Sequence, residues 1–98
     1  MTDTQSLYDK AIEARDTIHI SVILGFLEGQ GYKIIKEGEF ICEVVPPREL
    51  GIGTYKSKLD RDGYPIDQYQ ILLDAVDDII YRLEQTINKL ENNLSQSN

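Results

Sequence analysis

The chain has 98 residues, a formal net charge of −7 and an isoelectric point near 4.5. A chain of this length predicts a single domain, residues 1–98, that buries only about 60–65% of its unfolded surface. The strong acidity argues against direct binding to nucleic acid or to an anionic membrane, and it favours a basic protein partner.

Cysteine usage and hydropathy predict the compartment. Cys42 is the only cysteine, so no intrachain disulfide can form and a reducing interior is expected. No basic-then-apolar signal peptide begins the sequence. The longest nearly apolar run, Ile18–Leu27, has 10 residues and is too short for a membrane span. The sequence therefore predicts a soluble cytoplasmic protein.

The first predicted element is a helix. Residues 1–5 and 95–98 are expected to be frayed. Apolar residues at helical spacing, followed by glycines at 29 and 31 that can end a helix, predict one helix from Ser6 to Glu28. Residues 17–24 also alternate as a strand would, so a break near Thr17 is the alternative.

A β-hairpin follows. Two runs rich in β-branched and aromatic residues, 32–36 and 39–45, flank a Glu37-Gly38 turn in which glycine supplies a positive φ. The expected register pairs Ile34 with Ile41 and Ile35 with Phe40. Two prolines then end the second strand, because proline cannot donate to the ladder.

Residues 46–65 form a long connection. Within it, residues 53–59 are expected to add a short edge strand, kept soluble by lysines. The sequence Asp-Arg-Asp-Gly at 60–63 predicts a turn. A calcium loop aligned on its glycine would place Lys58 and Tyr69 where acidic ligands belong, so no metal site is expected.

The last helix, predicted for residues 67–94, carries the most regular signal. Its apolar residues are spaced alternately by four and three, which is the a/d pattern of a heptad repeat. This heptad seam consists of Leu73, Val76, Ile80, Leu83, Ile87 and Leu90, with Tyr69 and Leu94 at its ends. It predicts a homodimer of undetermined orientation. The alternative is that the helix packs antiparallel on the first helix of its own chain.

The predicted fold class is therefore α+β, in the order helix–β-hairpin–helix, with two long helices against a small antiparallel sheet. The acidity lies mostly on the helices: residues 1–30 carry a net charge of −3, residues 31–59 of +1 and residues 60–98 of −5.

Acidic residues follow two rows of the last helix, one on its outer face and one beside the seam. These candidate partner-binding residues are Asp67, Asp74, Asp77, Asp78, Glu84 and Glu91. A solvated helix face is the common explanation of such rows. The more specific interpretation is that they present carboxylates to a basic, nucleic-acid-handling protein.

Residues for catalysis are scarce. His19 is the only histidine and is expected on the inner side of the first helix, while Cys42 is expected as a small buried residue on a strand. One histidine and one cysteine do not make a zinc site. No enzyme activity, cofactor or metal is predicted.

A short, acidic chain with one cysteine and no catalytic set resembles, in composition and layout, small viral antagonists of host defence, anti-CRISPR proteins among them. The resemblance implies a non-enzymatic inhibitor in the host cell cytoplasm that blocks a basic, nucleic-acid-processing protein. The alternative function is a structural or adaptor protein that associates with itself through its C-terminal coiled-coil helix.

Overall fold

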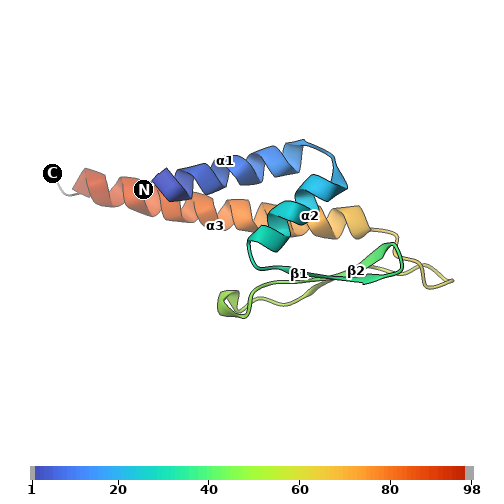
Figure 1. Ribbon diagram of the computed structural model, residues 1–98. Helices are drawn as coiled ribbons and strands as arrows, with labels where there is room; N and C mark the ends of the chain where they lie inside the picture. Colours follow the sequence, from blue (N-terminus) through green and yellow to red (C-terminus); the bar gives the residue numbers. More distant parts are fainter. Residues whose placement is uncertain (1, 97–98) are drawn as a thin grey trace.

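The computed structural model describes residues 2–96, and the side chains of residues 4–92. Figure 1 shows the elements in chain order. They are helix α1 (Thr2–Asp16), helix α2 (Ile20–Gly29), strands β1 (Lys33–Glu37) and β2 (Phe40–Val45), a 3₁₀ turn η1 (Arg48–Leu50), strand β3 (Tyr55–Lys56) and helix α3 (Gln68–Gln96). The predicted α+β class is confirmed.

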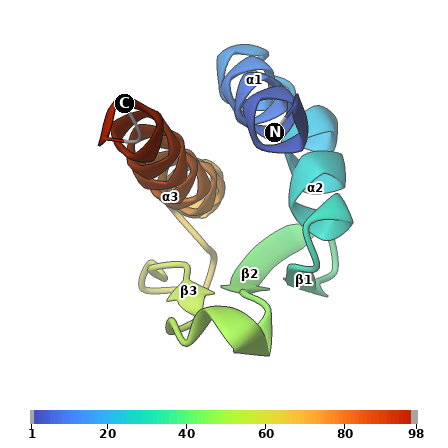
Figure 2. The same cartoon turned by 90° about the vertical axis from the view of Figure 1, so that its left-hand side faces the viewer.

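The helices lie on one face of an antiparallel sheet of order β1-β2-β3. Figure 2 shows α2 above β1, α3 above the β2–β3 side, and α1 farthest from the sheet, where it packs on both other helices. One core fills these layers. Its buried residues are Ala11, Ile23, Leu27, Tyr32, Ile41, Val44, Ile71, Leu72, Ala75, Val76, Ile79 and Ile80.

The prediction of one helix from Ser6 to Glu28 is wrong, and the alternative, a break near Thr17, is confirmed, because α1 ends at Asp16 and α2 begins at Ile20. Ile18 has φ +57, a left-handed conformation that is costly for a β-branched residue, and its side chain is 75% exposed. His19 follows in an extended conformation and is exposed rather than on an inner helix face. The corner turns α2 back (Figure 1), so that Ile23 and Leu27 join the same core as Ala11.

The end of α2 confirms the glycine signal. Gly31 has φ +89, and its N–H donates to Glu28 C=O at 3.0 Å. Tyr32 N–H donates to Leu27 C=O at 3.0 Å, which completes a Schellman motif with the buried Leu27–Tyr32 pair beside it. This cap places Tyr32 beneath α3.

The hairpin forms where it was predicted, but its register is different. Gly38, at φ +64, is the first residue of the two-residue turn, so Glu37 pairs with Phe40. Ile35 pairs with Glu43 and Lys36 pairs with Ile41, which leaves Cys42 as an extra, bulged residue.

The expected Ile34–Ile41 and Ile35–Phe40 pairs are therefore wrong, because the turn begins one residue later than predicted and a bulge follows it. Strict alternation would send residues 41 and 44 to opposite faces, whereas the bulge brings Ile41 and Val44 to the core together. Cys42 is half-buried beside them, not fully buried as expected.

The connection 46–65 contains the predicted edge strand, which is the two-residue strand β3 paired with β2. Within β3, Lys56 pairs with Glu43, so a basic side chain lies opposite an acidic one. The Ser57 hydroxyl then donates to Ile41 C=O at 2.9 Å. In the turn that follows, Asp60 Oδ1 accepts the N–H groups of Asp62 and Tyr64, both at 2.9 Å. The predicted turn at 60–63 is confirmed.

The molecule is elongated, with principal extents of 61 × 26 × 18 Å. Helix α1 already includes Thr2–Gln5 and α3 continues to Gln96, so most of the terminal residues expected to be frayed are helical. Met1, Ser97 and Asn98 lie outside the described residues. Within residues 2–96, no helix combines the length and the apolar character that crossing a membrane requires.

Candidate protein-binding surface

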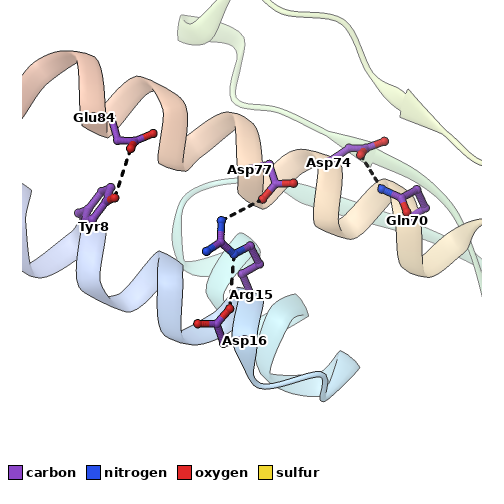
Figure 3. A network of polar contacts seen from close by, with 7 residues as sticks. All are labelled: Tyr8, Arg15, Asp16, Gln70, Asp74, Asp77 and Glu84. Atoms are coloured by element: carbon purple, nitrogen blue, oxygen red, sulfur yellow. Dashed lines mark hydrogen bonds and ion pairs between the residues drawn. The ribbon is translucent and has the colours of Figure 1, made fainter.

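The antiparallel pair α1–α3 builds a polar surface along one side of the molecule (Figure 3). The Arg15 guanidinium lies 3.6 Å from an Asp77 carboxylate oxygen, and the Tyr8 hydroxyl donates to Glu84 at 3.4 Å. Arg15 and Tyr8 are seven residues apart, as are Asp77 and Glu84. Residues at this spacing share one helix face, so Tyr8 and Arg15 lie on the face of α1 that meets Asp77 and Glu84 of α3.

Carboxylates dominate this junction. Arg15 also lies 3.5 Å from Asp16, and Asp74 accepts a hydrogen bond of 2.8 Å from the Gln70 amide (Figure 3). We define the acidic strip as Asp16, Asp74, Asp77 and Glu84. All four side chains are exposed, and Arg15 is the only base bonded to them among the described residues. The strip therefore keeps a net charge of −3 after Arg15 is counted.

Two of the predicted binding residues, Asp67 and Asp78, make hydrogen bonds within the fold. The Asp78 carboxylate accepts the Tyr55 hydroxyl and the Arg82 guanidinium, each at 2.7 Å. Asp67 accepts the Lys58 backbone N–H at 2.6 Å at the start of α3, which ties the preceding connection to the helix. Because the carboxylates of Asp67 and Asp78 already accept these hydrogen bonds, they are less available to a binding partner than the carboxylates of the acidic strip.

The other predicted acid, Glu91, is exposed on α3. Position 91 is seven residues beyond Glu84 and thus near the same helix face. It extends the acidic surface toward the end of α3. Asp77 and Glu84, predicted together on the row beside the seam, lie opposite Arg15 and Tyr8 of α1. Asp74, predicted on the outer row with Asp67 and Asp78, stays exposed, whereas the other two acids of that row bond to groups of the fold.

The heptad seam is largely covered by the chain itself. Val76 and Ile80 belong to the buried core, and Leu73 and Leu83 are half-buried against it. Ile87 is also half-buried, while Leu90 is 46% exposed. The antiparallel pairing with α1, which was the alternative interpretation, therefore accounts for the buried positions of the seam. The homodimer stays a prediction.

A tyrosine–carboxylate–arginine cluster under α3 was not anticipated from the sequence. Burial and the hydrogen bond to Asp78 raise the pKa of Tyr55 well above its ordinary value of 10.0. Burial also raises the pKa of Tyr32, against the opposing charge of Arg82. Both hydroxyls thus stay protonated in the folded protein at neutral pH, and that of Tyr55 donates to Asp78.

These pKa shifts predict a loss of stability at alkaline pH. Tyr32 and Tyr55 lose their protons more readily in the unfolded chain, so their contribution is full below pH 10 and falls above it. Each tyrosine can contribute at most about 1.4 kcal/mol per pH unit. The pKa of Tyr55 is the more strongly raised of the two, although partial exposure to solvent reduces its contribution. Urea unfolding between pH 8 and 11 measures the slope.

In that experiment, Tyr32→Phe and Tyr55→Phe should each flatten the decline of the free energy of unfolding. The matched control Tyr81→Phe removes a hydroxyl that is exposed on the outer face of α3, and it should keep the wild-type slope. Identical slopes in all variants would contradict the assignment of the alkaline loss to Tyr32 and Tyr55.

The side chains that could take part in catalysis or metal binding lie apart from one another on the rest of the described surface. No three of the described His, Cys, Asp and Glu side chains gather where they could hold a metal ion. His19 is exposed at the α1–α2 corner, far along the chain from Cys42 in the hairpin.

Comparison with protein-family models, with curated proteins and with solved structures finds no match for this chain. A functional proposal therefore rests on the chain's own residues.

Proposed function

We propose that this protein is a non-enzymatic inhibitor that binds a basic surface of a nucleic-acid-handling host protein and blocks it. The observation that supports the proposal is the acidic strip, in which exposed carboxylates from two packed helices gather with a net charge of −3. The resemblance in composition and layout to small viral antagonists of host defence points in the same direction.

Rigid helices suit this role. Asp74 and Glu84 are ten residues apart on α3, a rise of about 15 Å, and the core behind them fixes their backbone positions. A basic groove that binds phosphates offers the complementary potential, so the strip would compete with nucleic acid for it. Complementary charge of this kind mainly speeds encounter and selects the partner.

The test replaces three carboxylates of the strip by their amides. Asp74→Asn, Asp77→Asn and Glu84→Gln keep the side-chain shape, and because all three are exposed, the loss of their contacts should cost little stability. We expect the triple variant to bind its partner roughly tenfold more weakly than wild type at low salt. Affinity capture from host lysate, with elution in salt steps, identifies the partner, and titration of the purified partner gives the affinity.

A matched control carries the same change of charge on another surface. Glu37→Gln, Glu39→Gln and Asp62→Asn alter exposed acids at the hairpin end of the molecule and should leave the affinity within about twofold. Nucleic acid added in excess should release the partner. Equal losses in both triple variants, or capture that nucleic acid does not reverse, would contradict the proposal.

The alternative function, an adaptor that associates through the heptad seam, has less support because the chain itself covers much of that seam. At the distal end of the seam, Ile87 is half-buried and Leu90 is 46% exposed. Light scattering of Ile87→Glu and Leu90→Glu variants would show whether these residues join two copies. A dimer that these changes dissociate, in a protein that captures no basic partner, would favour the adaptor.

A further inference from the structure

The corner between α1 and α2 exposes three apolar side chains close together in the chain. Ile18, Ile20 and Val22 are 75%, 41% and 46% exposed, and none of them is part of the buried core. We call these three side chains the apolar corner. Residues 17–27 contain no Asp, Glu, Lys or Arg, in a chain of net charge −7. Exposed apolar side chains that gather in one place, unlike scattered ones, mark binding surfaces.

The backbone at Ile18 is strained. Its φ of +57 is a conformation that glycine adopts freely and that a β-branched residue adopts only at a cost. The fold requires this backbone conformation, because the corner turns α2 back to bury Ile23 and Leu27. The fold does not require the isoleucine side chain, which is exposed. A strained residue at such a position is characteristic of functional sites.

The apolar corner adjoins the acidic strip. Asp16, the member of the strip at the end of α1 (Figure 3), is only two residues before Ile18, a separation of at most about 7 Å. Asp77 lies at the same end of α1, since Arg15 is 3.6 Å from its carboxylate. A partner that covers this end of the acidic strip therefore also meets Ile18.

We propose that the apolar corner anchors the interface with the basic partner, and that Ile18 enters an apolar pocket bordered by lysine or arginine side chains. This inference rests on the proposed function and adds to it the chemistry of the partner's surface. The two parts of the interface contribute differently. Complementary charge on the acidic strip speeds association, whereas an apolar side chain buried in a pocket slows dissociation.

The test measures association and dissociation rates by surface plasmon resonance on the partner purified by affinity capture. Ile18→Asn removes the apolar group and introduces a residue that tolerates a positive φ. We expect it to raise the dissociation rate roughly tenfold at both low and high salt, and to leave the association rate within about twofold. The triple variant of the acidic strip should instead slow association, and mainly at low salt.

The matched control is Ile66→Asn, the same change at a side chain that is 64% exposed in the connection before α3. Both of its rates should equal those of the wild type. Equal acceleration of dissociation in Ile66→Asn and Ile18→Asn would overturn the proposal, because the effect would not belong to the corner.

Ile18→Gly tests the role of the strained residue without a partner. It should raise the melting temperature by about 4 °C, because glycine adopts this φ freely. It should also speed dissociation, as Ile18→Asn does. A lower melting temperature would mean that the Ile18 side chain serves the fold, and it would overturn the proposal.

The remaining outcomes separate this inference from the proposed function. Unchanged dissociation in Ile18→Asn, with association slowed in the strip variant, would overturn the anchor and leave the proposed function standing. Capture of no basic partner, or an unaffected strip variant, would overturn the proposed function and the anchor with it. Cosedimentation with phosphatidylcholine vesicles that Ile18→Asn abolishes would assign the corner to lipid, and it would overturn the proposal.

Discussion

Ile80→Ala is expected to lower the free energy of unfolding by about 2–5 kcal/mol. Ile80 is 5% exposed and lies in the core where α3 meets the rest of the chain. Its truncation removes buried apolar surface and leaves a cavity that close-packed neighbours fill only in part. Urea unfolding followed by circular dichroism measures the loss, which is a large share of the stability of a domain of this size.

The control is Ile66→Ala, which makes the same chemical change at a side chain that is 64% exposed. It should stay within about 0.5 kcal/mol of wild type. The loss at Ile80 should also be independent of protein concentration, because the residue is covered by its own chain. A loss that grows as concentration rises would mean that a second copy covers Ile80, as in the predicted seam dimer.

Asp78→Ala is expected to destabilise the protein by about 2–3 kcal/mol. It removes the acceptor of both the Tyr55 hydroxyl and the Arg82 guanidinium, which lie between α3 and the sheet. Partial exposure of the Arg82–Asp78 pair keeps the cost below that of a fully buried ion pair. Chemical unfolding at pH 7 provides the measurement.

Asp74→Ala is the matched control on the same helix. The Asp74 carboxylate is exposed and bonded only to Gln70 among the described residues, so its loss should change stability by no more than about 0.5 kcal/mol. If Asp74→Ala and Asp78→Ala cost the same, the distinction between an acid that serves the fold and one that serves the surface would be wrong.

Sequence patterns within single segments were enough to predict the last helix, the two hairpin strands and the end of α2. The last helix, the two strands and the glycine that ends α2 were all expected from periodicity and from φ preferences. The β-bulge at Cys42 was not, because register depends on which side chains the core requires. Ile41 and Val44 both face that core, and only the helices packed against the sheet reveal the requirement.

The corner at Ile18 shows tertiary packing overriding local preference. An isoleucine is among the residues least suited to a positive φ, and nothing in the neighbouring sequence signals a turn. The apolar residues of α2 gain more from joining the core than the corner costs. A continuous helix was therefore the reasonable expectation, and it was wrong.

Part of the candidate site could likewise be predicted from the sequence, and part could not. The acids of α3 were visible as rows, because helical periodicity alone places Asp77 and Glu84 on one face. The seven-residue interval between Tyr8 and Arg15 could have identified the facing side of α1. No sequence signal could join Tyr55 to Asp78, since their contact depends on how the sheet sits beneath α3.

The elongated shape of the molecule affects how its size must be measured. The radius of gyration is 15.7 Å, whereas a compact domain of this length has about 13 Å. Such a rod experiences more friction than a sphere of equal mass, so it diffuses slowly and elutes early from a sizing column. A single copy can consequently imitate a dimer by elution volume. Mass has to come from scattering or sedimentation equilibrium, which do not depend on shape.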